Sequence, residues 1–354
     1  VNERTDLFRT SSPVQVASGE NDWKLMASGG RSNLYGTAAI KTDGTMWVWG
    51  GNDNAVLGLN DQTKYSSPVQ IPGTWSNIVK ASEGFLATQE NGTLWYWGKN
   101  TYGMAGRNKA PANQWGYSSP TQIGTSTDWS TEIGQLGGGQ EANWAIKSNG
   151  TMWAWGGNNG ELGQDDTTKR SSPTQMGTDT NWAQIGGSAG GNFMAIKTNG
   201  TLWSCGEFGQ GQLGQNTNSN YSSPRQVGTD TTWNFCTGGT TSFATKTDGS
   251  LWSWGYGEHS GGVSGLGDED SRSSPTQIPG TWSTDYYTVT TADTQAGAID
   301  SSGRLWTWGQ NEVGQLGLNS RQNRSEPGQV GTDTDWKRLW NLSYGKSFAA
   351  FKKG

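Results

Sequence analysis

A short tryptophan motif, W-x-W-G, recurs six times and constrains the fold more than any other feature of the chain. Its first tryptophans are spaced by 48, 58, 50, 49 and 54 residues, at Trp47, Trp95, Trp153, Trp203, Trp252 and Trp306. One copy departs from the pattern, because Cys205 replaces the second tryptophan. A period of about 50 residues is typical of architectures in which each repeat buries its faces against its neighbours.

Three further landmarks share this period. A turn dipeptide precedes each motif, at Asp43-Gly44, Asn91-Gly92, Asn149-Gly150, Asn199-Gly200, Asp248-Gly249 and Ser302-Gly303. S-S-P begins at residues 11, 66, 118, 171, 222 and 273, with S-E-P at 325. Another tryptophan opens a further strand, at Trp23, Trp75, Trp129, Trp182, Trp233, Trp282 and Trp336. Asn-Gly and Asp-Gly between apolar runs predict two-residue hairpins in which both central residues take positive φ.

The composition fits a core of aromatic rings and many tight turns. Only 31% of the residues are hydrophobic, but the chain has 55 glycines and 21 tryptophans. The landmarks account for 18 of these tryptophans and leave Trp115, Trp144 and Trp340 outside the pattern. Each repeat is expected to form four short antiparallel strands. We therefore predict an all-β fold, a seven-bladed β-propeller in which residues 1–354 form a single domain.

The seventh repeat is incomplete. It supplies Trp336 and a strand at residues 348–352, with Lys353 and Gly354 at the turn, but no W-x-W-G motif follows. Because the N-terminal part supplies S-S-P, we expect the last blade to be shared between the two termini. Residues 5–9 are expected to fill part of the missing strand. The alternative is an open edge that another chain could pair with, which would allow a larger assembly through this seam.

The repeats resemble the regulator of chromosome condensation repeat family. The segments that carry this resemblance are 39–52 (A-I-K-T-D-G-T-M-W-V-W-G-G-N), 158–163 (N-N-G-E-L-G) and 310–317 (Q-N-E-V-G-Q-L-G), and the likeness covers essentially the whole chain. The family implies the propeller fold but hosts several roles. Its members include a chromatin-bound nucleotide exchange factor, a plant ultraviolet photoreceptor and a secreted bacterial inhibitor of β-lactamase. The residue pattern of the repeats in this chain is most similar to that of bacterial or phage members.

Charge and composition argue against several classes of function. The net charge is −5 and no basic run is present, so neither nucleic acid nor an anionic membrane surface is an expected partner. No stretch approaches the roughly 20 apolar residues of a membrane span. The G-W-R-H-T pattern of the photoreceptor is absent. The single histidine, His259, lies in a glycine-rich loop, so we expect no catalytic residue, no metal and no cofactor.

We considered three kinds of chemical site: calcium sites, a catalytic pair of carboxylates and a disulfide bond. The acidic segments 165–166 and 268–270 could hold calcium, but Asx-turns explain them better. A pair of carboxylates for glycoside hydrolysis is not visible as a repeated pattern. Cys205 and Cys236 are expected to be buried free thiols, with a bridge between blades as the alternative.

Residues that break the repeat are candidates for partner binding. The most variable segment lies between the first and second strands of each repeat, and these loops should share one face of the ring. The 58-residue repeat adds an insertion over residues 108–117. The predicted partner-binding residues are Arg31, Asn33, Tyr35, Glu83, Phe85, Trp115, Tyr117, Gln140, Glu141, Asn143, Asn192, Asp293, Gln295 and Lys346. The aromatic members could instead begin the next strand and pack inward.

The sequence thus favours a non-enzymatic binding or structural module that presents loops to a protein or glycan partner. A phage virion or bacterial surface component is the expected setting, with an extracellular or virion-associated location. The alternatives are a secreted inhibitor of a bacterial enzyme and a carbohydrate-active enzyme.

Overall fold

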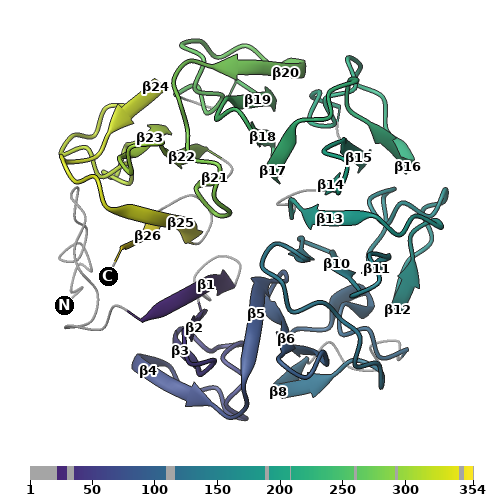
Figure 1. Ribbon diagram of the computed structural model, residues 1–354. Coiled ribbons are helices and arrows are strands. Elements are labelled where there is room, and N and C mark those ends of the chain that lie inside the picture. The colour runs from purple at the N-terminus through teal and green to yellow at the C-terminus, as the bar shows by residue number, and fades with distance from the viewer. Residues whose placement is uncertain are drawn as a thin grey trace, which may run out of the picture.

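The chain folds into a ring of small antiparallel sheets (Figure 1). The computed structural model describes residues 22–29, 36–108, 116–187, 191–207, 209–258, 261–291, 294–342 and 347–353. Within them lie six four-stranded sheets, here called blades 1 to 6, and one two-stranded sheet. The strand landmarks therefore predicted the four-stranded blade correctly. In the described residues only six of the seven expected blades have four strands.

Each blade runs from an inner first strand to an outer fourth strand. Blade 1 contains β1 (Trp23–Gly29), β2 (Gly36–Lys41), β3 (Met46–Gly50) and β4 (Tyr65–Ile71). Blade 2 contains β5 (Trp75–Lys80), β6 (Gly84–Gln89), β7 (Leu94–Gly98) and β8 (Tyr117–Gln122), with the short 3-10 helix η2 (Thr101–Gly103) after β7. Blade 3 contains β9 (Leu136–Gly138), β10 (Ala142–Ile146), β11 (Met152–Gly156) and β12 (Arg170–Gln175).

The other half of the ring repeats this order. Blade 4 contains β13 (Trp182–Ile185), β14 (Asn192–Lys197), β15 (Leu202–Gly206) and β16 (Tyr221–Gln226). Blade 5 contains β17 (Trp233–Thr237), β18 (Thr241–Lys246), β19 (Leu251–Gly255) and β20 (Arg272–Ile278). Blade 6 contains β21 (Val289–Thr291), β22 (Gln295–Ile299), β23 (Leu305–Gly309) and β24 (Arg324–Gln329). The two-stranded sheet contains β25 (Trp336–Leu342) and β26 (Ser347–Lys352).

Two blades depart from the expected start of the first strand. Trp129 and Trp282 form only isolated bridges, with Lys147 and Asp300, and the inner strands begin later, at Leu136 and Val289. The landmark tryptophan thus marks where the chain joins the blade. In blades 3 and 6, several further residues follow this tryptophan before the inner strand pairs with its neighbour.

The hairpin between the second and third strands differs from the prediction. In the Asp43-Gly44 turn of blade 1, only the glycine has positive φ, at 82°. The Gly44 amide donates to the Lys41 carbonyl, so the glycine is the last residue of the turn. Asp43 keeps negative φ because its carboxylate accepts the amide of Thr45 at 2.9 Å and the hydroxyl of Thr45 at 2.7 Å. The same hydroxyl accepts the indole N–H of Trp47 at 3.0 Å. One short relay thus explains why a turn residue, Gly, Thr and Trp recur together.

A second recurring contact joins neighbouring blades. In three blades the indole of the second tryptophan in W-x-W-G donates to a backbone carbonyl in the turn of the preceding blade. The distance is 2.8 Å for Trp155 to Met104, for Trp254 to Gln212 and for Trp308 to Val263. Each of these rings is fully buried. Since one blade cannot bury both of its faces alone, these rings supply much of the contact between blades.

The S-S-P strand is also joined to its neighbour. A residue in the turn of one blade, held at positive φ, donates its amide to the first serine of the next blade's fourth strand. The bonds are Asn60 to Ser118 at 2.7 Å, Asn108 to Ser171 at 2.8 Å, Asp165 to Ser222 at 2.9 Å and Asn216 to Ser273 at 2.7 Å. We call this contact the staple. It explains why S-S-P and a preceding Asn or Asp recur with the same period.

The two-stranded sheet closes the described part of the ring between blade 6 and blade 1 (Figure 1). The segments expected to complete it, residues 5–9 and the first S-S-P, lie outside the described residues. None of the helices in the described residues has the length and apolar character that crossing a membrane requires.

Candidate partner-binding face

Antiparallel order places two loops of every blade on the same face of the ring. The loop between the first and second strands and the loop between the third and fourth strands meet there, and a backbone bond joins them. Examples are Lys99 to Glu83 at 3.1 Å, Gly157 to Glu141 at 2.7 Å and Glu207 to Gly191 at 2.8 Å. We call this surface the loop face. The prediction that the variable loops share one face is consistent with this pairing.

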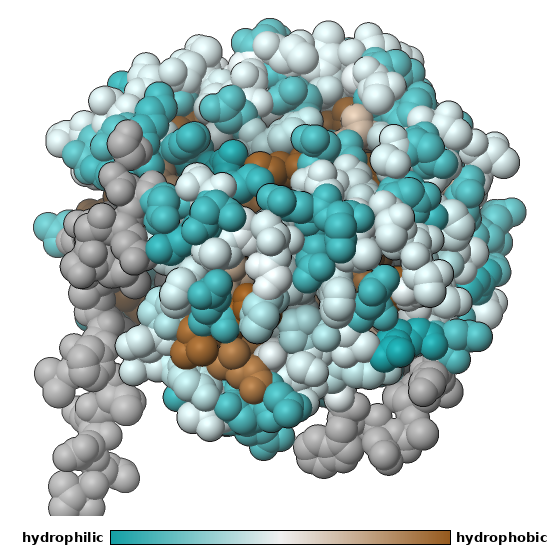
Figure 2. Space-filling view, turned by 60° about the horizontal axis from the view of Figure 1, so that its bottom comes forward, coloured by the Kyte–Doolittle hydropathy of each residue, from teal (hydrophilic) through white to brown (hydrophobic). Residues whose placement is uncertain are grey.

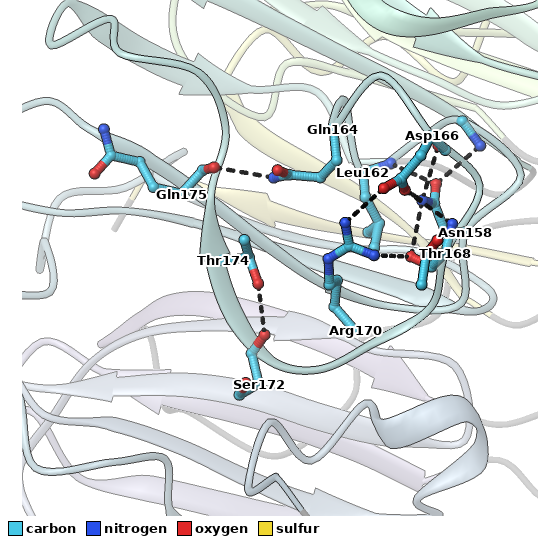
Figure 3. Close-up of polar contacts among 10 residues, drawn as sticks. Asn158, Leu162, Gln164, Asp166, Thr168, Arg170, Ser172, Thr174 and Gln175 are labelled. Carbon is cyan, nitrogen blue, oxygen red and sulfur yellow. Dashed lines mark hydrogen bonds and ion pairs between the residues drawn. The ribbon is translucent and has the colours of Figure 1, made fainter.

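A buried asparagine shapes the longer of the two loops. In blade 3 the Asn158 side-chain oxygen accepts the amide of Gly160 at 2.9 Å, while its nitrogen donates to the carbonyls of Asp166 and Thr168 at 3.0 Å each (Figure 3). Arg170 closes the loop with a 2.8 Å ion pair to Asp166. Loops held in this way are shaped before any partner binds, which lowers the entropic cost of binding.

Glu83 holds two blades together on this face. One carboxylate oxygen accepts the side-chain amide of Asn54 in blade 1 at 2.8 Å, and the other pairs with Lys99 in its own blade at 3.0 Å. The carboxylate is therefore satisfied within the chain. It remains partly accessible, because the side chain is 12% exposed.

Three further carboxylates gather where blade 3 meets blade 4. Glu161 is buried, Glu141 is half-buried and Glu207 is exposed. Burial, with smaller contributions from the charges of Glu141 and Glu207, raises the pKa of Glu161 to about 7. The Glu161 carboxylate accepts the amide of Asn159 at 2.5 Å.

The same loop contact is made by glutamine in two other blades. Gln212 accepts the amide of Gln210 at 3.0 Å, and Gln315 accepts that of Val313 at 3.0 Å. Because a neutral amide makes this bond equally well, the position of Glu161 is explained by loop structure and does not require a catalytic role.

An aromatic and basic patch lies at the outer margin of the loop face, between blades 2 and 3. Tyr102 is 38% exposed, and the Lys169 ammonium lies 3.9 Å from the centre of its ring. In the same loop, the Arg107 guanidinium lies 5.5 Å from the ring of Tyr117. We call these four residues the tyrosine patch. Tyr117 was predicted from the insertion, but Tyr102 was missed because a single tyrosine in a loop carries no pattern.

Four of the predicted binding residues are buried and contact the fold itself. Phe85 packs against Trp97, with ring centres 5.6 Å apart, and Asn143 donates to the Met104 carbonyl at 2.9 Å. Asn192 and Gln295 are also fully buried. For Phe85 the inward alternative is the one observed, because the residue belongs to β6 and its neighbours on that strand are buried too.

The remaining predicted residues divide into two groups. Gln140 and Glu141 lie half-buried on the loop face. Outside the described residues lie Arg31, Asn33, Tyr35, Trp115, Asp293, Lys346 and also His259.

The acidic loops form Asx-turns, as expected. Asp166 accepts the amide of Thr168 at 2.8 Å, and Asp268 accepts that of Asp270 at 3.1 Å. Asp268 also pairs with Arg272 at 2.6 Å, which lowers the pKa of the Asp268 carboxyl.

Asp268 borders a surface pocket of about 410 Å³ between blades 5 and 6. In the described part of the chain, no group of three His, Cys, Asp or Glu side chains is arranged to hold a metal ion.

Both cysteines are free and buried, as expected. The Cys236 thiol lies 3.0 Å from the side-chain oxygen of Gln184 in blade 4, and the Cys205 sulfur lies 3.9 Å from the Glu161 carbonyl of blade 3. Burial raises the pKa of both thiols. The alternative of a bridge between them is therefore wrong.

Comparison with known proteins identifies the repeats. The model of the regulator of chromosome condensation (RCC1) repeat matches residues 43–84 and 302–346. The mitochondrial RCC1 domain-containing protein RUG3 of Arabidopsis thaliana is 26% identical over 307 residues, which are 79% of this chain and 65% of RUG3. The human E3 ubiquitin-protein ligase HERC2 is 22% identical over 303 residues. That match covers 82% of this chain but only 6% of the ligase.

Solved structures agree on the fold. The crystal structure of human WBSCR16 superposes with a TM-score of 0.79 at 19% identity, over 95% of this chain and 89% of that one. Yeast RCC1 (Prp20), solved bound to Kap60, superposes with a TM-score of 0.74 at 19% identity, over 94% and 81%. A second structure of Prp20p from Saccharomyces cerevisiae was described with its binding properties to Gsp1p and histones. The solved structures show the same fold, and the family model and the relatives show that the chain is similar to RCC1-repeat proteins.

Proposed function

We propose that this chain is a non-enzymatic binding module that meets a protein partner through the tyrosine patch on its loop face. The observation that carries the proposal is the 38% exposure of Tyr102, whose ring lies beside the Lys169 ammonium. Tyrosine and arginine dominate the energetics of protein interfaces, because they bury large area and retain a polar group. The yeast relative was solved with a protein bound, which supports a protein as the class of partner.

The surface of the molecule offers polar surroundings for such an interface. Hydrophilic residues cover most of the surface in Figure 2, and hydrophobic areas are confined to small patches between them. An interface of this kind has an aromatic centre and a polar rim. Glu83 and Glu141 would belong to the rim.

The test is a comparison of variants in quantitative affinity purification from the source organism. Tyr102→Ala combined with Lys169→Ala should remove a partner that the unchanged chain retains. Glu90→Ala, an exposed position at the hairpin on the opposite face, is the control and should retain it. If both variants retain the same proteins, the tyrosine patch is not the binding surface.

We also propose that the ring closes with a seventh blade shared by the two termini. Asn319 in blade 6 has φ of 52°, like the residues that form the staple in the other blades. The equivalent acceptor for its amide would be the carbonyl of Ser11 in the first S-S-P. The double variant Ser11→Cys with Asn319→Cys should then form a disulfide under mild oxidation. Asn60→Cys with Ser118→Cys is the positive control, because these residues are joined by a 2.7 Å bond.

A glycan partner, a virion or bacterial surface component and an extracellular location stay predictions, and the relatives reported above are eukaryotic. The mass of the native particle that contains this chain tests them. A large assembly would favour a structural component, whereas a particle near 38.0 kDa would favour a soluble binder or the inhibitor alternative.

A further inference from the structure

We propose that two bulges, residues 131–134 of blade 3 and residues 284–287 of blade 6, meet across the ring axis and make opposite sides of the ring open as one unit. We call the pair the axial strap. Blades 3 and 6 lie on opposite sides of the ring (Figure 1), so a contact between their bulges crosses its centre. The inference is independent of the tyrosine patch, which lies at the outer margin of the loop face.

The two bulges share a sequence pattern and a local structure. Residues 129–132 read W-S-T-E, and residues 282–285 read W-S-T-D. In each bulge the serine hydroxyl accepts the amide of the acidic residue two positions later, at 3.1 Å for Glu132 and 3.3 Å for Asp285. Such a bond offers the backbone an alternative to the strand ladder, which explains why both inner strands begin late.

The chain leaves and rejoins the ladder at matching positions in the two blades. Two backbone bonds to one isoleucine of the second strand bracket each bulge. The bonds are Ser130 to Ile146 at 3.0 Å, Ile146 to Gln135 at 3.0 Å, Ser283 to Ile299 at 3.0 Å and Ile299 to Thr288 at 2.8 Å. Because the first strand is the innermost strand of a blade, the residues that leave the ladder project toward the ring centre.

The two bulges contact each other at the centre. A methyl group on Gly134 would lie only 3.8 Å from the ring of Tyr286, and the Gly134 amide faces the hydroxyl of Tyr287. Gly134 is buried and has φ of 86°, a conformation that glycine reaches without strain. Repeats in a ring normally contact only their neighbours, so this contact is an added link that bypasses blades 4 and 5.

Tyr287 connects the strap to two further sheets. Its ring lies 6.0 Å from Phe235 of blade 5 and stacks on Trp340 of β25 at 5.9 Å. Its carbonyl accepts the Leu339 amide at 2.7 Å. The residue has φ of 62°, which is strained for an aromatic side chain. Such a conformation persists only where the surrounding contacts impose it, so Tyr287 is a fixed point of the strap.

Further hydrogen bonds anchor each bulge to a neighbouring blade. They run from the Asn77 side chain of blade 2 to the Glu132 carbonyl at 2.8 Å, from the Ile185 amide of blade 4 to the Gly134 carbonyl at 2.8 Å, and from the Asn234 side chain of blade 5 to the Thr284 carbonyl at 2.5 Å. The strap therefore joins blades 2 to 6 and the two-stranded sheet.

Hydrogen exchange tests whether the two sides open together. Tyr286→Ala with Tyr287→Gly removes both rings, and the glycine relieves the backbone strain. The Ile185 amide, which bonds to the opposite bulge, should then exchange about tenfold faster, because that bulge loses its support. The Val227 amide, bonded at 2.8 Å within the outer half of the same blade, is the internal reference and should change by less than about twofold.

Tyr65→Ala, at the outer edge of blade 1, is the control variant and should change neither rate. An unchanged Ile185 rate in the strap variant would overturn the proposal. So would an equal increase at Ile185 and Val227, since that result would mean a general loss of stability without a specific link between the bulges.

A second test uses milder changes, in case the strap variant does not fold. Asn77→Ala and Asn234→Ala each remove one hydrogen bond to a different bulge. If the bulges act as one strap, the two changes together should lower Tm by about two-thirds of the sum of their separate effects. Asn77→Ala with Arg272→Ala, at the rim of blade 5, is the matched pair and should be additive. Additivity in both pairs would contradict the proposal.

Discussion

The junction of blades 3 and 4 and the junction of blades 4 and 5 are built on the same plan from different residues. In the second junction, the Trp254 ring of blade 5 packs with Met194 of blade 4 and donates to the Gln212 carbonyl at 2.8 Å. In the first, Cys205 stands where Trp254 stands in the second. The cysteine is far too small to fill the same volume.

Trp144 compensates from the opposite side of that junction. It occupies the strand position of Met194, since Trp144 pairs with Ala154 as Met194 pairs with Ser204. Its indole is fully buried and donates to the Glu161 carbonyl at 3.1 Å. The ring and its hydrogen bond are retained, but they come from the neighbouring blade. What the junction requires is one indole at this site, and either blade can provide it.

The largest expected effect is that of Trp144→Ala. The substitution removes a fully buried ring from a junction in which Cys205 replaces the second tryptophan of the motif, so we expect a loss of about 3–5 kcal/mol in unfolding free energy. Met194→Ala at the other junction should cost about 2–3 kcal/mol, because the Trp254 ring stays in place. Denaturant unfolding measures both.

The exchange can also be tested by moving the ring. Cys205→Trp alone should destabilise by about 1–3 kcal/mol, because two indoles cannot share the site. Cys205→Trp with Trp144→Met reproduces the pair found at the next junction and should recover most of the loss. If the double variant is as unstable as the sum of the two single variants, the two positions do not share one volume.

This comparison also shows how far sequence reasoning can reach. The relay of Asp43, Thr45 and Trp47 is local, so its landmarks predicted the strands and their order within a blade. The role of Trp144 depends on a residue in a different repeat, and along the sequence it appeared only as a tryptophan outside the pattern. Phe85 lies in the core because it belongs to β6, where its neighbours are buried as well, but from the sequence it could equally have belonged to a binding loop.

The second expected effect is that of Glu161→Gln, which makes the first junction chemically similar to the second, where Gln212 stands. The pKa of Glu161 is raised to about 7 by burial, from an ordinary value of 4.5. The folded state therefore binds this proton more tightly than the unfolded state does. Stability is fully retained below about pH 4.5 and falls as the pH rises toward 7.

The variant removes this loss. We expect Glu161→Gln to be more stable than the unchanged chain by about 3 kcal/mol at pH 8 and equal to it at pH 4. Thermal unfolding at the two pH values measures the difference. Gln212→Glu is the converse change and should introduce the same loss at the second junction. A pH-independent effect would show that Glu161 acts through packing alone.

A smaller effect is expected at the staple, which both junctions share. Asn216 and Asp165 have φ of 57° and 60° and donate to the next fourth strand. Asn216→Ala should cost about 1 kcal/mol, because the short polar side chain that helps Asn to adopt the left-handed region is absent in Ala. Asn216→Gly should be close to neutral. Asp165→Ala should cost about the same as Asn216→Ala, since the staple does not depend on the residues that distinguish the junctions.

The smallest effect is expected at the ion pairs on the hairpin side of the two junctions. Lys197 pairs with Asp179 at 2.9 Å, and Lys246 pairs with Asp230 at 2.8 Å. Both aspartates are more than half exposed, with side-chain exposures of 54% and 56%, so solvent screens the attraction. Asp179→Asn and Asp230→Asn should each cost about 0.5 kcal/mol or less, and 1 M salt should remove the difference. Equal losses would show that these ion pairs do not depend on whether Trp144 or Trp254 supplies the ring. A clearly larger loss for Asp179→Asn would mean that the exchanged ring also changes the lysine beside Trp203.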